Sequence, residues 1–271
     1  MRDTTTNLVA TEDAQPQYGL GMRLYAVVWW ICFASFTCAM FVWTLIASVT
    51  VLVDRRRRWF HLLTVCFWGW AVYAFNPFWS LRVEGREKLP MDGRAVLVPN
   101  HDSLADILVC GALFRPFKFV SKESVFKVPV LGWAMRMLRY IPLRRGERAS
   151  VTAMMQMCRE TLRSEHPVLL FPEGTRSEDG VVRPFKDGAF QLAVETDSPV
   201  YPIILAGTRD ALPKHGFVAP LESHVRMRVL DPVYPAEFGH NVDRLRDHVR
   251  TVIVAEKQRL TAQLDAERPR L

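Results

Sequence analysis

The sequence predicts an α/β fold, with a mixed and largely parallel sheet flanked by helices, preceded by apolar helices at a membrane. Two observations predict it. Residues 24–53 are thirty consecutive residues without a charge, a proline or a glycine, and an α-helix needs about 20 apolar residues to cross a bilayer. After Leu81 the pattern changes to short apolar runs separated by stretches with helical spacing, an alternation typical of α/β layers.

The N-terminal part is expected to hold a polar tail, residues 1–23, of which 1–17 are flexible, and then membrane-embedded helical segments, residues 24–81. The second apolar segment, residues 59–81, lacks Asp, Glu, Lys and Arg and carries four tryptophans, which favour the headgroup region of a bilayer. This segment either lies in the interface after a single crossing or forms a shallow hairpin with the first.

Four arginines at positions 55–58 lie between the two apolar segments. Positive flanking charge resists translocation, so this loop is expected in the cytoplasm. We therefore expect a protein of the inner, cytoplasmic membrane whose third region, a domain of residues 82–271, faces the cytoplasm.

Six short runs with β-branched residues predict the strands of that domain. In order they are AVLV (95–98), KFVS (118–121), YIPL (140–143), VLLF (168–171), VYPIIL (200–205) and VRMRVL (225–230). Stretches with helical spacing predict helices at 103–114, 130–138, 150–164, 187–195 and 242–265. In the last helix, Leu245, Val249, Val252, Ile253 and Leu260 lie near one face.

Charge limits the classes of molecule that this protein is expected to bind, and cysteine spacing indicates whether disulfides or metal sites are expected. The net charge is +7 and the pI about 9.4, which favours anionic lipid or acidic soluble partners. No recognition motif for nucleic acid accompanies the charge, so no nucleic-acid partner is expected. The five cysteines form no CxxC pair and no metal-ligand spacing. We expect them to be small apolar side chains in a reducing compartment, without a disulfide or a metal site.

Polar side chains gather where three of the predicted strands end. Strand 95–98 leads into Asn100, His101 and Asp102, strand 118–121 leads into Lys122, and strand 168–171 leads into the PEGTR stretch of residues 172–176. Ligands of open α/β sheets bind beyond the carboxyl ends of strands. These three ends are therefore the expected site.

The stretch NHDSLAD, residues 100–106, supports two interpretations. In one, Ser103 and Asp106 form a capping box that starts a helix, and His101 is a loop residue. In the other, His101 is a general base, because imidazole has a pKa near ~6.5. Asp106, one turn into the helix, can then point back and hold the other ring nitrogen. Asp102 is placed less favourably for that contact.

Four ordered blocks resemble the glycerolipid acyltransferase family. They are NHDSLAD; a stretch whose matching positions are Lys122, Pro129, Gly132, Ile141 and Arg145; FPEGTRS, residues 171–177; and VYPIILAGT, centred on Pro202. Together they cover about Leu89 to Thr208. Ser121, where small apolar residues are usual, and Arg144, where an acidic residue is common, depart from the pattern. These departures concern the shape of the acceptor pocket.

The resemblance implies a reaction centre. His101 and Asp106 are the catalytic residues, and the acceptor hydroxyl attacks a thioester directly, because no activated serine or cysteine is evident and Ser103 caps the helix. The resemblance assigns Glu173, Gly174, Thr175 and Arg176 to the acceptor, with Lys122 and Arg145 completing a basic pocket for phosphate. The alternative for these residues is a tight turn braced by an ion pair. Lys186 and Arg183 lie nearby without an assigned role.

The expected function is transfer of a fatty acyl group from acyl-acyl carrier protein or acyl-coenzyme A, as co-substrate, to the sn-2 hydroxyl of 1-acyl-sn-glycerol 3-phosphate. The product is phosphatidic acid. No metal and no bound cofactor are expected, and the partners are lysophosphatidic acid, the acyl donor and the bilayer. Another lysolipid acceptor and a noncatalytic lipid-binding module are the alternatives.

Overall fold

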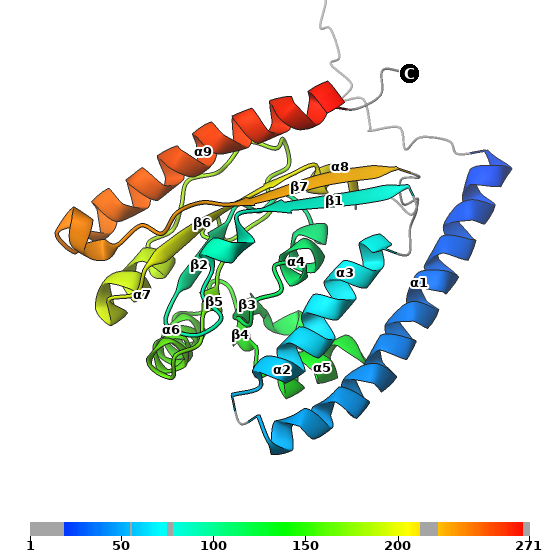
Figure 1. Ribbon diagram of the computed structural model, residues 1–271, viewed down its shortest axis with the longest axis horizontal. Coiled ribbons are helices and arrows are strands. Elements are labelled where there is room, and N and C mark those ends of the chain that lie inside the picture. Colours follow the sequence, from blue (N-terminus) through cyan, green and yellow to red (C-terminus); the bar gives the residue numbers. More distant parts are fainter. Residues whose placement is uncertain (1–18, 55, 75–77, 212–221, 268–271) are drawn as a thin grey trace, which may run out of the picture.

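A seven-stranded mixed sheet forms the centre of the computed structural model (Figure 1), which describes residues 19–54, 56–74, 78–211 and 222–267. Its strands are β1 Trp79–Glu84, β2 Val96–Pro99, β3 Lys118–Lys122, β4 Ile141–Leu143, β5 Val168–Leu169, β6 Val200–Ala206 and β7 Ser223–Val229. The order across the sheet is β1-β7-β6-β2-β5-β3-β4. Only the β6–β7 pair is antiparallel among the described pairings of these strands, so β1 and β7 run opposite to the other five.

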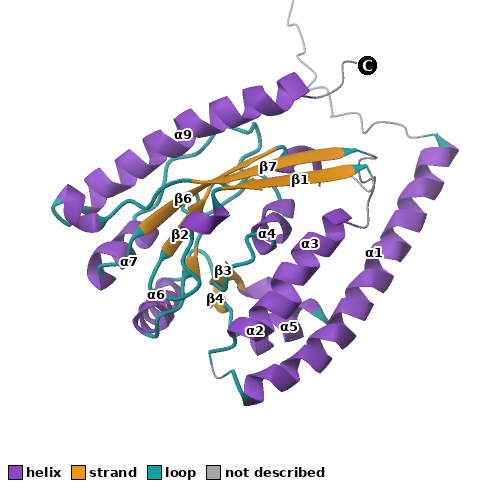
Figure 2. Cartoon of the chain, viewed as in Figure 1, coloured by secondary structure: helices purple, strands orange, loops and turns teal. Residues whose placement is uncertain are grey.

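Helices cover both faces of this sheet (Figure 2). They are α1 Leu20–Ala47, α2 Arg58–His61, α3 Phe67–Ala74, α4 Ala105–Gly111, α5 Leu131–Met137, α6 Arg148–Arg163, α7 Gly188–Thr196, α8 Thr208–Ala211 and α9 Val242–Glu267. A 3₁₀ turn, Ser48–Leu52, extends α1, and a π-helical turn, Leu62–Cys66, joins α2 to α3. Shorter 3₁₀ turns lie at Arg86–Lys88, Glu123–Lys127 and Pro235–Phe238. The predicted α/β class is confirmed.

Alternation along the buried strands divides the core into two layers. Val96 and Val98 of β2 pack in one cluster with residues of α6, α7 and α9. Leu97, between them, packs in a second cluster with residues of α3, α4 and α5. Successive side chains of a strand point to opposite faces, so a strand that is buried on both faces must be apolar throughout. The run AVLV meets that requirement.

The sheet begins earlier than the sequence predicts. The membrane-embedded region was expected to reach residue 81, but Trp79–Glu84 is β1, an edge strand parallel to β7. Its tryptophan is buried against Trp29 and Tyr73. An apolar, aromatic strand of this kind continues the composition of the preceding helix, so composition alone does not mark the boundary. The tail was expected to reach residue 23, but α1 already begins at Leu20. Residues 1–18 and Arg55 lie outside the described residues.

The first apolar segment is one long helix, Leu20–Leu52, and within the described ranges it is the helix whose length and composition suit a membrane crossing. It lies beside the α2–α3 segment, which runs back along it (Figure 1). The Trp43 side chain donates to the Leu63 carbonyl at 2.6 Å, and Phe41 contacts Trp133 of α5, with 5.6 Å between ring centroids. Many apolar side chains of this helix remain exposed.

The second apolar segment is helical from Arg58 to Ala74 and packs on the domain. Phe60, Cys66 and Ala71 are fully buried there. Its closest approach is to α4, where Gly69 faces Gly111: a Cβ on Gly69 would lie 2.4 Å from the Leu108 carbonyl oxygen and 3.0 Å from the Gly111 Cα. Only residues without a side chain permit main chains to approach so closely. The face that contacts α4 is not available to lipid, which favours the interfacial and hairpin alternatives over a second crossing.

Replacing Gly69 tests this packing. Gly69→Ala introduces a methyl group against a main-chain carbonyl, and we expect it to lower the free energy of unfolding by about 1–3 kcal/mol. Gly21→Ala, in a part of α1 with nothing within 4 Å, is the control and is expected to leave stability unchanged or slightly higher. The measurement is denaturant unfolding in detergent. Equal stabilities of the two variants would contradict the α3–α4 contact.

Candidate active site

His101 and Asp106 meet where β2 ends. The His101 Nδ1 lies 2.7 Å from Asp106 Oδ2, and both side chains are buried, with 9% of the His101 side chain and none of the Asp106 side chain exposed. His101 sits in the loop after β2, while Asp106 lies in the first turn of α4. The two side chains therefore make the contact that the catalytic interpretation requires.

The same carboxylate oxygen also caps the helix. Asp106 Oδ2 accepts hydrogen bonds from the main-chain N–H groups of Asp102, at 2.7 Å, and Ser103, at 2.8 Å. The Ser103 hydroxyl accepts from the Ala105 N–H at 3.2 Å. Asp106 thus makes its half of the predicted capping box, whereas the Ser103 hydroxyl binds the Ala105 N–H in place of the Asp106 N–H. An oxygen that accepts two N–H groups is also an acceptor toward Nδ1, so in a neutral His101 ring Nε2 is the nitrogen that can take a proton.

The loop after β5 supports the other side of the imidazole. The Phe171 ring stacks on the His101 ring, with 4.0 Å between centroids and 19° between planes. The Ser177 N–H donates to the His101 carbonyl at 2.8 Å. These contacts restrain His101 at three points. Asp106 binds the edge of its ring, Phe171 stacks on the face of the ring, and Ser177 holds the His101 main chain.

Glu173 does not face the cavity to which the resemblance assigns it. Its side chain is buried, and its two oxygens accept from the main-chain N–H groups of His101, at 2.7 Å, and Arg183, at 2.9 Å. Burial raises the pKa of the Glu173 carboxyl, and those two hydrogen bonds oppose the rise. Glu173 therefore braces the loops behind the site. The bracing partners are main-chain N–H groups rather than the ion pair that the alternative interpretation supposed.

The side chains on either side of His101, Asn100 and Asp102, bind β6 and α9. Asn100 extends the β2–β6 pairing, because its amide donates to the Leu205 carbonyl at 3.0 Å and accepts from the Leu205 N–H at 2.8 Å. Asp102 pairs with Lys257 of α9, its Oδ2 lying 2.6 Å from Nζ. Burial raises the pKa of the Asp102 carboxyl, and the Lys257 ammonium opposes that rise.

A cavity of about 440 Å³ opens in front of His101. Its lining includes most of the residues that were expected to bind the acceptor, namely Lys122, Arg145, Gly174, Thr175 and Arg176. Asp106 and Glu173 lie behind it. The described side chains of the lining include four basic groups and no acidic one. A cavity of this charge suits an anion, and phosphate is the anion to which Arg and Lys bind best.

Lys186 is the basic group that sequence reasoning left unassigned. Its main-chain N–H donates to the Pro172 carbonyl at 2.9 Å, and its side chain runs over Gly174, where a Cβ would lie 2.9 Å from Lys186 Nζ. Gly174 has φ +69°, a conformation that glycine adopts without strain. Glycine is therefore needed here both for the turn and for the passage of the lysine.

The two positions that depart from the family pattern lie differently. Arg144 turns outward and binds Glu123 at 2.5 Å, whereas Arg145 lines the cavity. Ser121 lies between this cavity and a second, apolar one, and it lines both.

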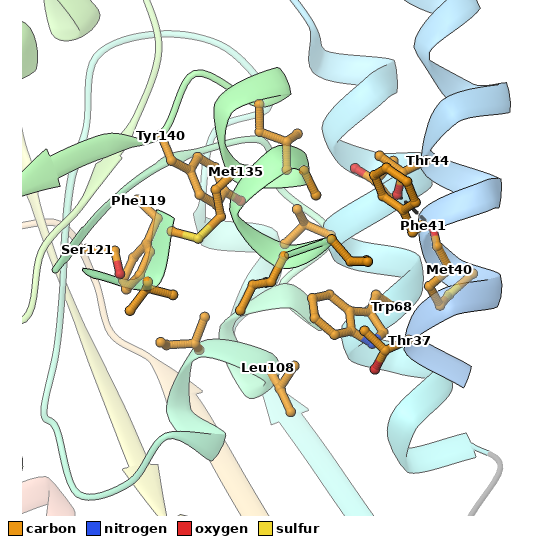
Figure 3. Close-up of a pocket in the computed structure, with 18 of the residues that line it drawn as sticks. Thr37, Met40, Phe41, Thr44, Trp68, Leu108, Phe119, Ser121, Met135 and Tyr140 are labelled. Carbon is orange, nitrogen blue, oxygen red and sulfur yellow. Dashed lines mark hydrogen bonds between the residues drawn. The ribbon is translucent and has the colours of Figure 1, made fainter. Parts of the chain in front are cut away.

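The second cavity, of about 110 Å³, adjoins the first and reaches the N-terminal helices. Ile107, Phe119, Ser121 and Val125 line both. Figure 3 shows Phe119, Ser121, Met135 and Tyr140 on one side of it, with Thr37, Met40 and Phe41 of α1 on the other. His101 lines the basic cavity, and the apolar cavity adjoins that one, so together the two cavities suit an amphiphilic molecule.

All five cysteines, at positions 32, 38, 66, 110 and 158, are unpaired. In the part of the chain that the structure describes, no three His, Cys, Asp or Glu side chains are grouped to hold a metal ion.

Comparison with known proteins identifies similar chains. Residues 80–206 match the family model described as Acyltransferase. The chain is 35% identical, over 92% of its length and 71% of the other, to a chloroplastic 1-acyl-sn-glycerol-3-phosphate acyltransferase of Brassica napus. It is 34% identical, over 90% and 68% of the two chains, to a chloroplastic protein of the same description from Arabidopsis thaliana.

A solved structure is similar as well. The crystal structure of the 1-acyl-sn-glycerophosphate acyltransferase PlsC from Thermotoga maritima superimposes with a TM-score of 0.76 at 27% identity, and the match covers 88% of this chain and 97% of that one. The similarity therefore includes the sheet and most of the helices around it.

The bracing role of Glu173 can be tested by stability. Glu173→Gln replaces one acceptor oxygen by an amide NH₂, so that one of two buried N–H groups loses its partner, and we expect a loss of about 1–3 kcal/mol in the free energy of unfolding. Glu237→Gln, at an exposed position, is the control and should unfold like the parent. Denaturant titration followed by circular dichroism measures both. A Glu173→Gln variant as stable as the control would place this carboxylate in the cavity after all.

Proposed function

Because this chain belongs to the acyltransferase family, we propose that it moves a fatty acyl group from a thioester to the sn-2 hydroxyl of 1-acyl-sn-glycerol 3-phosphate, giving phosphatidic acid. The observation that carries the proposal is the buried His101–Asp106 pair at 2.7 Å, at the wall of a basic cavity that adjoins an apolar one. The substrate named for the relatives has a phosphate that suits the basic cavity, a hydroxyl that suits the His101–Asp106 pair, and an acyl chain that suits the apolar cavity.

The reaction follows from the state of the imidazole. His101 Nε2 accepts the proton of the acceptor hydroxyl as its oxygen attacks the thioester carbonyl carbon. Asp106 stabilises the imidazolium that forms, through Nδ1. The tetrahedral intermediate then collapses, the carbon–sulfur bond breaks, and the proton on Nε2 passes to the leaving sulfur. One hydroxyl and one thioester become one ester and one thiol, without an acyl-enzyme.

The acceptor phosphate is assigned to the basic cavity. Lys122 at the end of β3 and Arg145, Arg176 and Lys186 from the loops after β4 and β5 line it together. A phosphomonoester carries up to two negative charges and suits several cations at once. Thr175 can add a hydroxyl donor. The apolar cavity would then hold an acyl chain, since its lining is apolar and it adjoins the reaction centre.

The membrane role is part of the proposal. Exposed apolar side chains run along α1 and continue on the domain at Val128 and Trp133, and the ring of Trp133 contacts Phe41 of α1. A surface of this kind suits the bilayer, from which a lysophospholipid could enter laterally. We place the protein at the cytoplasmic membrane with its domain facing the cytoplasm, where the acidic donors, acyl carrier protein and coenzyme A thioesters, are found. We propose no metal and no bound cofactor.

Replacing His101 tests the catalytic assignment against a noncatalytic lipid-binding module. His101→Ala removes the base, and we expect thiol release from an acyl donor to fall by about 10²- to 10⁴-fold. His240→Ala, at an exposed position, should retain full activity. The assay uses purified protein in detergent with lysophosphatidic acid and each donor type. Unchanged turnover in His101→Ala would refute an enzymatic role for this residue.

A pair of adjacent arginines tests the acceptor. Arg145→Met removes a cation from the cavity, and a lost charge-assisted hydrogen bond should reduce kcat/KM for lysophosphatidic acid by about 10- to 100-fold. Activity toward a monoacylglycerol, which lacks the phosphate, should change little. Arg144→Met, at the neighbouring side chain that turns away to Glu123, is the matched control. Equal losses on both acceptors would favour a different lysolipid substrate.

A further inference from the structure

Lys257 of the C-terminal helix α9 places a buried ammonium group near the carboxylates around His101. Asp102, Asp106 and Glu173 are all buried beside this histidine. The Asp106 carboxylate binds the His101 ring, and the Glu173 carboxylate accepts from two main-chain N–H groups. The Asp102 carboxylate binds a cation instead. Its oxygens lie 2.8 Å and 2.6 Å from Lys257 Nζ.

Lys257 is held as firmly as the carboxylate it binds. Its side chain is 10% exposed and that of Asp102 5%. Its ammonium group also donates to the Gly180 carbonyl at 2.7 Å. An ammonium group has three donors, and here they meet both carboxylate oxygens and one carbonyl. Lys257 therefore joins α9, the loop that contains Gly180 and the loop that contains His101.

The sequence of α9 places this lysine where an apolar residue is expected. The buried residues of the helix are Leu245, Val249, Ile253, Lys257, Leu260 and Leu264. These positions recur every three or four residues, as the apolar stripe of a helix does. A charged side chain in such a stripe costs solvation free energy, and exchange of a buried ion pair for apolar residues is often neutral or stabilising. A contribution to folding stability therefore explains the presence of the Asp102–Lys257 ion pair poorly.

The position of Asp102 gives a better reason. Its main-chain N–H is one of the three donors to Asp106 Oδ2, so displacement of Asp102 moves a donor of the His101–Asp106 contact. An unpaired carboxylate at residue 102 would also repel the neighbouring carboxylate of Asp106. The ion pair prevents both effects.

We propose that Lys257 is a positioning residue of the transfer reaction, which holds Asp102 so that Asp106 keeps its contact with the His101 imidazole. This inference rests on the proposed function. It extends the active site to α9, which lies outside the residues 80–206 that match the family model.

The test is a double-mutant cycle on turnover. Lys257→Met keeps the length of the side chain and removes the charge, and we expect kcat to fall at least about tenfold while KM for lysophosphatidic acid stays within about twofold. Asp102→Asn removes the other charge. In Lys257→Met/Asp102→Asn no unpaired buried charge remains, so most of the lost kcat should return. Wild-type kcat in Lys257→Met, or a double variant no more active than Lys257→Met, would overturn the proposal.

Arg250 provides the matched control. It lies on the same helix and donates to the carbonyls of Val182 and Arg183, so it tethers the same loop without a contact to Asp102. Arg250→Met should lower thermal stability with kcat largely retained, and adding Asp102→Asn to it should restore nothing. Restoration by Asp102→Asn in this background would show that the rescue is unspecific and would overturn the proposal.

The pH dependence of stability gives a readout without activity. The charged groups that face Asp102 are Lys257 of α9, Asp106 of α4, and His101 and Glu173 of the adjacent loops. Without the Lys257 ammonium, burial raises the pKa of Asp102 further. A carboxyl whose pKa is higher in the folded than in the unfolded state lowers the free energy of unfolding as the pH rises from the unfolded pKa toward the folded one. The difference in unfolding temperature between the parent and Lys257→Met should therefore widen as the pH rises above about 4, the pKa of an unfolded Asp, and the double variant should lack this widening.

The same variants separate failure of the inference from failure of the proposed function. A wild-type protein that transfers no acyl group would refute the function. In that case, the rate at which diethyl pyrocarbonate modifies His101, followed by peptide mass spectrometry, replaces kcat. Loosening of the loop in Lys257→Met should raise that rate at least about threefold. Equal rates in the parent and the variant, or a pH-independent stability difference, would overturn the positioning role.

Discussion

The site depends on one carboxylate oxygen. Asp106 Oδ2 receives the His101 Nδ1 and the main-chain N–H groups of Asp102 and Ser103, each within 2.8 Å. One oxygen therefore fixes both the imidazole and the turn that leads from β2 into α4. Buried N–H groups outside a helix or sheet need partners elsewhere, and Asp106 supplies them here. A short polar stretch thus orders its own main chain and orients the base through a single side chain.

The rest of the sheet edge is organised around that oxygen. The loop after β5 brings Phe171 against the face of His101 and Glu173 against its main chain. Helix α9 crosses β6 and β7 and brings Lys257 to Asp102. Parallel strands end at the same edge, so loops that are 70 or more residues apart in sequence meet there. Each of these contacts limits the motion of the imidazole rather than touching a substrate.

Two cavities of different character adjoin at the candidate site. The basic cavity holds four cations, and the apolar cavity is closed by α1, α2–α3 and α5. The close contact of Gly69 with Gly111 fixes the second apolar segment on α4, the helix that also carries Asp106. The segments that suit a bilayer are thus built into the wall of the candidate site. A substrate with a charged head and an apolar chain can meet both cavities at once.

The sequence by itself determined the α/β class and most strands and helices from residue 95 onward, although it missed the short helix Thr208–Ala211. It also placed His101 and Asp106 within reach of each other, whereas Lys122, Arg145 and Arg176 were singled out by the resemblance to a family. Strand alternation, helical spacing and polar strand ends are properties of neighbouring residues, which is why local patterns predict them. Tertiary structure decided the strand Trp79–Glu84, the inward turn of Glu173, and the positions of Lys186 and Lys257. The physical reason is that the direction of a side chain is set by what packs against it, and those partners lie far away in the sequence.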